Sequence, residues 1–133
     1  MEKTKNFIQA TGRRKTSVAQ VKLFENGSGL FKINSKTLDE YFGGNFRLKS
    51  TATSPLQLVE NNTFDCSVKV VGGGTASQAG AIKHGIARAL SYLGDSFKAR
   101  MKKAGYLTRD SRMVERKKSG RPKARKRFQF SKR

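Results

Sequence analysis

The basic residues of this chain are concentrated toward its C-terminal end, which limits how much of the chain can build a hydrophobic core. Residues 98–133 contain 16 lysines and arginines against two acids, from totals of 29 basic and 9 acidic residues. So many like charges cannot pack together away from water without a polyanion to neutralise them. We therefore expect one folded domain over residues 1–105, followed by an extended basic tail over residues 106–133.

The net charge of +20 also narrows the class of partner, since such an excess favours nucleic acid or an anionic surface. The single cysteine, Cys66, allows no internal disulfide, which is typical of a reducing compartment. No apolar stretch approaches the roughly 20 residues of a membrane span, and the start of the chain lacks the apolar core of a signal peptide. We expect a soluble intracellular protein with no membrane partner.

Alternating apolar and polar residues predict strands at residues 6–11, 17–24, 30–34 and 63–72. Gly12 and the three cations after it are expected to end the first strand. Asn26-Gly27 is a strong hairpin signal, so the second and third strands are expected to pair with each other. In the fourth strand Cys66 falls on the apolar face, which predicts a core position.

The most regular helical pattern covers residues 75–94, with an apolar stripe that includes Ile82, Ile86 and Leu90. Thr75 and Gln78 have the spacing of a capping box, and Gly94 stands where a C-terminal glycine belongs. Small residues in this segment predict that part of the helix lies close to the sheet. A second helix is expected over residues 95–105, closed by its last glycine.

Residues 35–42 predict a short helix, and residues 46–61 a less regular one that Pro55 opens or kinks. The resulting order is three strands, helical material, a strand and two helices. Runs of each type without regular alternation favour an α+β fold with two layers, a sheet and its helices.

The glycine-rich segment 72–80 lies before a helix, where exposed N–H groups can bind phosphate. It lacks the third glycine of a dinucleotide fingerprint, because Ser77 stands there, and it lacks the Gly-Lys-Ser/Thr of a phosphate loop. We expect a tight strand-to-helix turn and no nucleotide cofactor. An anion site for an RNA phosphate stays open at this turn.

No group of residues in the sequence predicts catalysis or metal binding. His84 is the only histidine and no cysteine cluster accompanies it, so no metal set is expected. The acids are scattered, which leaves no paired carboxylates. We expect a protein that is not an enzyme, with His84 on a helix surface where it is able to touch RNA.

Two basic clusters are candidates for phosphate contact. Arg13, Arg14 and Lys15 are expected in a turn between strands, and residues 116–133 hold ten cations and no acid. Phe128 and Phe130 add aromatic rings that stack on bases or pack into protein crevices. Nucleic-acid contacts are expected at Arg13, Arg14, Lys15, Arg109, Arg112, Arg116, Lys117, Lys118, Arg121, Lys123, Arg125, Lys126, Arg127, Phe128 and Phe130.

Four stretches resemble the bacterial or organellar family of small-subunit ribosomal protein nine. They are "ATGRRKTSVA" (10–19), "GGG" with "QAGAIKHGIARAL" (72–74 and 78–90), "LTRDSRMVERKKSG" (107–120) and "KARKRFQFSKR" (123–133). The resemblance covers nearly the whole chain. Two positions depart from the family's usual pattern, Ser77 where a glycine is usual and Gln20 where a basic residue is usual.

The resemblance implies a sheet with helices on one side, like the second domain of small-subunit ribosomal protein five, with a left-handed βαβ crossover. It implies a structural role in the head of the small subunit, bound to the 3′ major domain of its ribosomal RNA beside other head proteins. It further implies an extended tail whose last residues, Ser131, Lys132 and Arg133, contact the anticodon stem-loop of transfer RNA (tRNA) in the peptidyl (P) site. The location is then the bacterial cytoplasm or the interior of an organelle.

Two other function classes are also compatible with a chain this basic. An enzyme that uses the glycine turn would bind nucleotides. A DNA-compacting or membrane-active cationic protein would prefer duplex DNA over ribosomal RNA at equal salt. The basic, aromatic tail alone does not separate DNA from RNA; only the resemblance does.

Overall fold

The computed structural model describes residues 7–25, 27–59, 64–113 and 116–126. Its elements confirm the predicted order and add one short strand. They are β1 (Phe7–Arg14), β2 (Ser17–Phe24), β3 (Phe31–Ile33), β4 (Lys36–Thr37), α1 (Leu38–Phe42), α2 (Phe46–Val59), β5 (Asp65–Val71), α3 (Thr75–Ser91) and α4 (Asp95–Lys103).

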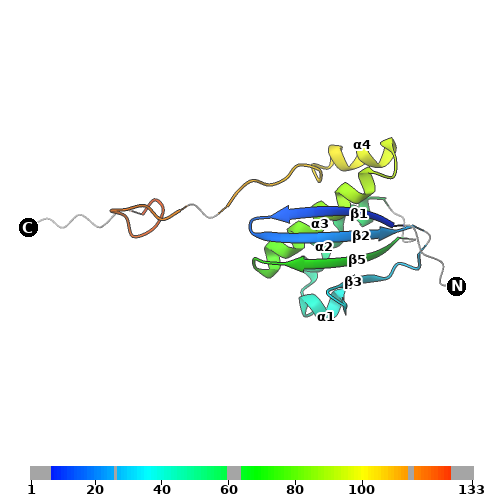
Figure 1. The fold of residues 1–133 in the computed structure, drawn as a ribbon, viewed down its shortest axis with the longest axis horizontal. Helices are drawn as coiled ribbons and strands as arrows, with labels where there is room; N and C mark the ends of the chain where they lie inside the picture. Colours follow the sequence, from blue (N-terminus) through cyan, green and yellow to red (C-terminus); the bar gives the residue numbers. More distant parts are fainter. Residues whose placement is uncertain (1–6, 26, 60–63, 114–115, 127–133) are drawn as a thin grey trace, which may run out of the picture.

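The five strands form one sheet in the order β1-β2-β5-β3-β4 (Figure 1). β1, β2 and β5 pair in antiparallel fashion, β3 and β4 form a hairpin, and β3 runs parallel to β5. Because α1 and α2 lie between β3 and β5 in the chain, these elements form a parallel βαβ unit. The mixed α+β class is confirmed, while the hand of this crossover stays a prediction.

The hairpin expected between the second and third strands is wrong, because β5 lies between β2 and β3 in the sheet. The connecting loop crosses the start of β5 instead of turning back on β2. Asp65 holds it there, since Oδ1 of its carboxylate accepts from the backbone N–H groups of Ser28 and Leu30, both at 2.9 Å. The tight hairpin occurs farther on, at Asn34-Ser35, where both residues have the positive φ that such a turn requires.

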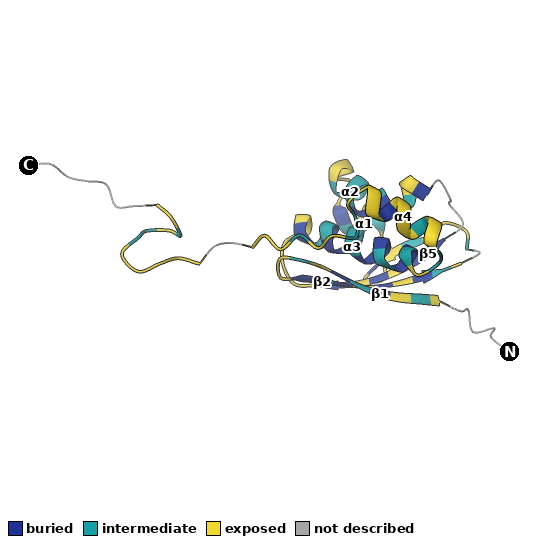
Figure 2. Ribbon diagram, turned by 90° about the horizontal axis from the view of Figure 1, so that it is seen from above, coloured by how far each residue is buried: buried dark blue, intermediate teal, exposed yellow. Residues whose placement is uncertain are grey.

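All four helices cover the same face of the sheet, and the core lies between the two layers (Figure 2). The alternation predicted for the strands is confirmed: Val21, Leu23 and Val68 are buried, whereas Lys22 and Lys69 are exposed. Cys66 is buried as expected, and burial raises the pKa of its thiol to about 12. None of the helices in the described residues covers the opposite face of the sheet, which is called the open face below.

The first strand continues past Gly12 to Arg14, so the expectation that Gly12 ends it is wrong. Gly12 is required inside the strand because α3 packs directly on it. A Cβ atom there would lie 1.9 Å from the carbonyl oxygen of Ala81. The turn between β1 and β2 is instead formed by Lys15 and Thr16, with Lys15 at a φ of 52°.

The long helix begins at residue 75 as predicted, but the residues predicted to cap its start and the predicted end are wrong. Its N-cap is Gly74, whose N–H donates to the Ser77 hydroxyl at 3.1 Å, so Ser77 has the role assigned to Gln78. The helix ends at Ser91, and Gly94 serves as the N-cap of α4.

The glycine predicted to close the second helix does so. Gly105 has a φ of 79°, its N–H donates to the Lys102 carbonyl, and the N–H of Tyr106 donates to the Met101 carbonyl. This pair of bonds satisfies carbonyls that the last turn of a helix leaves without partners.

Pro55 lies inside α2 and does not open it. A proline at this position removes the bond to the Thr51 carbonyl. The hydroxyl of Ser54 donates to that carbonyl at 3.0 Å, which replaces the missing partner.

After α4 the chain leaves the helical layer and passes beyond the β1–β2 turn (Figure 1). Residues 116–126 contain no helix or strand, and they form a turn in which the Arg121 N–H donates to the Lys118 carbonyl at 3.3 Å. This segment is therefore bent at Gly120 and not fully extended. Over the described ranges, no helix combines the length and apolar character of a membrane span.

Candidate nucleic-acid interface

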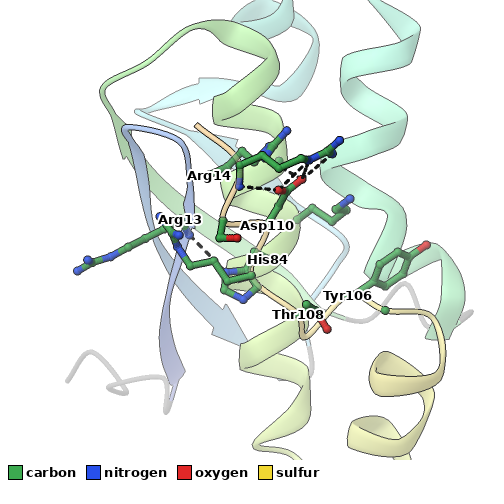
Figure 3. Close-up of a pocket in the computed structure, with 12 residues that line it drawn as sticks. Arg13, Arg14, His84, Tyr106, Thr108 and Asp110 are labelled. Carbon is green, nitrogen blue, oxygen red and sulfur yellow. Dashed lines mark hydrogen bonds and ion pairs between the residues drawn. The ribbon is translucent and has the colours of Figure 1, made fainter. Parts of the chain in front are cut away.

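Three segments that are distant in the sequence meet around one cleft of about 430 Å³ (Figure 3). They are the end of β1, the first half of α3 and the chain that follows α4. We call this site the basic cleft. It is lined by Arg13, Arg14, Gly80, Lys83, His84, Gly105, Tyr106, Thr108, Arg109, Asp110, Ser111 and Arg112.

The cleft exists because α3 approaches the sheet at backbone distance. A Cβ atom on Gly85 would lie 2.6 Å from Cγ2 of Val21, and one on Gly12 would lie 2.2 Å from the backbone nitrogen of Gly85. The predicted close approach of the small-residue face of this helix is therefore confirmed. It brings the polar side chains on the adjacent face of α3 within reach of β1.

Two of these side chains bond to the outer edge of β1. His84 Nδ1 accepts from the backbone N–H of Arg13 at 3.4 Å, and Arg88 Nη1 donates to the Thr11 carbonyl at 2.7 Å. Both contacts fix the end of the strand against α3. They set the direction in which Arg13 and Arg14 leave the sheet.

The bond from Arg13 requires that Nδ1 of His84 carries no proton. The pKa of His84 is lowered, first because the ring is partly buried and also because Arg88, Arg109 and Lys83 are near. A hydrogen bond to the backbone of Leu107 opposes this shift. The neutral ring that accepts from β1 is thus the favoured form near neutral pH.

Of the residues that the structure describes, Asp110 is the only acid that lines the basic cleft, and it joins the cleft's two sides. Its Oδ2 lies 2.7 Å from Arg14 Nη1 and 2.7 Å from Arg112 Nη2. Hydrogen bonds from the side chain and backbone of Arg112 hold the pKa of Asp110 well below its usual range. Arg14 Nη1 is buried without a well-aligned hydrogen bond among the described residues, so Asp110 is its counter-charge.

The remaining cations of the cleft outnumber this acid. Lys83 Nζ lies 5.6 Å from the centre of the Tyr106 ring, a cation–π distance that leaves its charge available. Arg13 and Arg109 are exposed. Clustered guanidinium and ammonium groups around a concave surface attract phosphate, and they offer no nucleophile or general base of a catalytic set. Among the residues placed by the structure, no cluster of acids, histidine or cysteine suits a metal.

The structure brings together four residues predicted to bind RNA: Arg13, Arg14, Arg109 and Arg112. Lys15 lies in the adjoining turn and does not line the cleft. Seven more lie along the segment 116–126, away from the cleft: Arg116, Lys117, Lys118, Arg121, Lys123, Arg125 and Lys126. Six predicted contacts lie outside the described residues: Arg127, Phe128, Phe130, Ser131, Lys132 and Arg133.

Sequence reasoning missed Lys83, Tyr106 and Asp110. A signal for Lys83 was present, because Gly80, Lys83 and His84 are spaced three and four residues apart on one helical face. Nothing local in the sequence indicated that Asp110 pairs with Arg14, since the partner lies on a distant strand.

The glycine turn before α3 is a separate place from the basic cleft. Its groups bond within the protein: Ser17 Oγ and Gln78 Nε2 donate to the Gly72 carbonyl, and the hydroxyls of Ser17 and Ser77 lie 2.8 Å apart. Ser77, the departure from the usual glycine, is thereby part of a buried hydroxyl pair. The anion site considered for this turn stays a prediction.

Comparison with known proteins agrees with the resemblance seen in the sequence. Residues 12–133 match a family described as ribosomal protein S9/S16. "Small ribosomal subunit protein uS9" of Anaeromyxobacter sp. (strain K) is 53% identical over 123 residues, which cover 92% of this chain and 93% of the relative. The protein of the same description from Borrelia duttonii (strain Ly) is 54% identical over 129 residues, covering 96% and 93%.

Proposed function

Because the chain belongs to the ribosomal protein S9/S16 family, structural and non-enzymatic constituents of the small ribosomal subunit, we propose that its basic cleft binds the phosphate backbone of small-subunit ribosomal RNA. The supporting observation is the convergence of Arg13, Arg109 and Lys83 from three separate segments on one concave surface. Isolated surface cations bind phosphate nonspecifically, whereas cations fixed relative to one another select a shape of RNA backbone.

The RNA we propose is the 3′ major domain, in the head of the subunit, with other head proteins as neighbours. The cations of segment 116–126 extend the contact beyond the cleft, because they are mostly exposed and carry no acid among them. The bacterial source of both relatives favours the bacterial ribosome over an organellar one.

The test of the cleft is the double variant Arg13→Gln/Arg109→Gln. Each lost phosphate contact should lower affinity on the order of fivefold at about 0.15 M salt, so we expect a roughly 20- to 30-fold loss. The slope of log K against log salt should become shallower by roughly 2. The measurement is filter binding of a 3′ major domain transcript across a salt series.

The matched control is Lys98→Gln/Arg100→Gln on α4, which removes the same charge from exposed positions outside the cleft. A loss in the control as large as that in the cleft variant would mean that only net charge matters. The cleft would then have no special role in RNA binding.

The finer part of the proposal assigns the end of the chain to tRNA. Removing Ser131, Lys132 and Arg133 takes away two cations whose contacts with RNA contribute on the order of 1 kcal/mol each. We expect P-site tRNA to bind several-fold to thirtyfold more weakly, with subunit assembly intact. The measurement is tRNA filter binding to messenger-programmed small subunits, with the shortened protein confirmed in the particle.

Within this assay Lys132→Ala/Arg133→Ala should reproduce most of the loss, and Ser131→Ala little of it. Equal tRNA affinity for wild-type and shortened subunits would restrict the tail to ribosomal-RNA contacts.

A further inference from the structure

The open face of the sheet carries three lysines on three neighbouring strands: Lys22 on β2, Lys69 on β5 and Lys32 on β3. The strand register places Lys22, Ser67 and Lys32 in one row across the sheet. Lys22 and Lys32 are thus two strand spacings, roughly 10 Å, apart. Lys69 lies two residues farther along β5 and completes a triangle on the same face.

None of the ion pairs formed within the described residues involves any of the three lysines. The acid nearest to the three lysines in the strand register is Asp65, which pairs with Phe24. Its Oδ1 accepts hydrogen bonds from two backbone N–H groups of the loop before β3. Asp65 lies on the same face as Lys69, since the two alternate with buried residues along β5, and it lines a hollow together with Lys32. The three lysines outnumber this acid, and like charges in such proximity favour a polyanionic partner.

A hollow of about 390 Å³ lies beside the lysines. Lys22 and Lys69 line it together with hydrogen-bonding side chains, among them Gln20, Asn34 and Ser67. The Asn34 side chain is held in a fixed position at one side of this hollow, because its amide forms two hydrogen bonds with the backbone of Val70, both at 3.0 Å. A fixed concave surface with two cations and several donors suits a phosphate with its sugar.

Aromatic rings lie in the neighbouring row of the same face, two residues along β1 and β2 from the lysine row. Phe7 and Phe24 are paired in the register, and their ring centres lie 5.5 Å apart. Phe7 is 46% exposed, and Lys22 Nζ lies 5.1 Å from its ring centre. A smaller hollow of about 210 Å³, lined in part by Phe24 and Leu30, adjoins them.

From this arrangement we propose that the open face is a second RNA-binding surface, which takes an unpaired stretch of ribosomal RNA. The lysine triangle binds its phosphates, and the Phe7–Phe24 pair stacks against a base. Aromatic rings and cations on an exposed sheet are the combination with which proteins bind single-stranded RNA. An acidic protein segment would use the lysines but would leave the exposed ring without a partner.

The inference rests on the proposed function in that it assumes a ribosomal-RNA partner, but it concerns the face opposite the helical layer. A protein that contacts RNA on both sides would join two segments of the RNA. The strand register places the Arg13 side chain toward the open face, but the basic cleft and the hollow beside the lysines have no lining residue in common, so they can be tested apart.

The first experiment compares lysine acetylation in the free protein and in purified small subunits, read by mass spectrometry. Lys22, Lys32 and Lys69 should each react at least fivefold more slowly in the subunit. Linkage of the same lysines to RNA by 2-iminothiolane and ultraviolet light should leave a nucleotide on their peptides. Undiminished acetylation in the subunit, or protection accompanied by links to protein in place of RNA, would overturn the proposal.

The second experiment measures affinity for the 3′ major domain transcript with Lys22→Gln/Lys32→Gln/Lys69→Gln. Three lost contacts at about 0.15 M salt should weaken binding on the order of 100-fold and make the salt slope shallower by roughly 2 to 3. Lys98→Gln/Lys102→Gln/Lys103→Gln on α4 removes equal charge from exposed positions. An equal loss in this control would contradict the proposal.

The two proposals fail in different ways. If Arg13→Gln/Arg109→Gln binds like wild type while the open-face variant is weak, the cleft assignment is wrong and this one holds. The reverse pattern would overturn the open face alone.

Discussion

Arg14 at the end of β1 and Asp110 beyond α4 form an ion pair of 2.7 Å between Nη1 and Oδ2. The same carboxylate bonds Arg112, so a single acid connects the sheet to the start of the basic tail. In a chain of net charge +20 this acid holds together two basic segments, the end of β1 and the chain after α4, that would otherwise repel. The geometry of the basic cleft depends on it.

Replacing that acid should release the start of the tail. In Asp110→Asn the cations of the cleft lose their common counter-charge, so residues 108–112 should open more often. We expect trypsin to cleave after Arg109 and Arg112 several-fold faster in the native protein. Asp39→Asn, which removes the other acid that forms an ion pair among the described residues, is the control and should leave this rate unchanged.

The native fold should lose stability between neutral and mildly acidic pH through His84. Its folded-state pKa is lowered from 6.5, so the unfolded chain binds the proton first as the pH falls. The free energy of unfolding should therefore be constant above about pH 7.5 and should fall as the pH drops through 6.5. Below the folded-state pKa this contribution levels off.

Urea midpoints measured between pH 5.5 and 7.5 test this, because the chain contains no other histidine. In His84→Asn the amide oxygen keeps an acceptor for the Arg13 N–H but does not titrate. A pH dependence that persists unchanged in this variant would show that another group is responsible.

The backbone contact between β1 and α3 should tolerate no side chain at Gly12. A Cβ atom there meets the Ala81 carbonyl at 1.9 Å, so Gly12→Ala should cost about 1–3 kcal/mol or more of stability. Gly80→Ala is the matched control, because its Cβ meets only the flexible Arg14 side chain, at 3.1 Å. Alanine in a helix gains roughly 0.5–1 kcal/mol over glycine, so this variant should be neutral or more stable. Thermal unfolding followed by circular dichroism distinguishes the two.

The folded domain should be stable without residues 114–133 but should need the first residues of the tail, just after α4. Tyr106 and Leu107 pack against the core, so a chain ended at residue 113 should unfold cooperatively at a higher urea concentration than one ended at 105. Burial of two partly covered side chains suggests a difference of about 1–2 kcal/mol. Identical midpoints would show that these contacts contribute nothing. Loss of cooperative unfolding in both would mean that the basic tail belongs to the folded domain.

The sequence was most informative where periodicity and local chemistry decide the structure. The buried faces of β2 and β5, the stripe on α3 and the stop at Gly105 all follow from residues close to each other in the chain. The pairing of β3 with β5 does not follow from neighbouring residues, because it depends on the hydrogen bonds from the loop before β3 to Asp65, which lies much later in the chain. At the start of α3 the capping-box spacing of Thr75 and Gln78 did not identify the cap, because Ser77 bonds both Gly74 and Ser17. At its end Gly94 did not mark the stop, because this glycine caps the next helix.

The candidate site was likewise only partly predictable. The sequence predicted Arg13, Arg14, Arg109 and Arg112 as candidate phosphate ligands without showing that they line one cleft. Their meeting requires the glycine contact between β1 and α3, which is a property of two surfaces and not of either segment alone.

The contacts of His84 and Arg88 with β1 have a consequence for the protein before it reaches its RNA. β1 is a long strand at the border of the sheet, and such a strand exposes backbone groups that invite another chain to pair with it. Side chains of α3 already occupy the Arg13 N–H and the Thr11 carbonyl. A newly made molecule is thus protected over this stretch from adding strand to strand with its copies. These two contacts of α3 should therefore oppose self-association of the free protein before it joins the subunit.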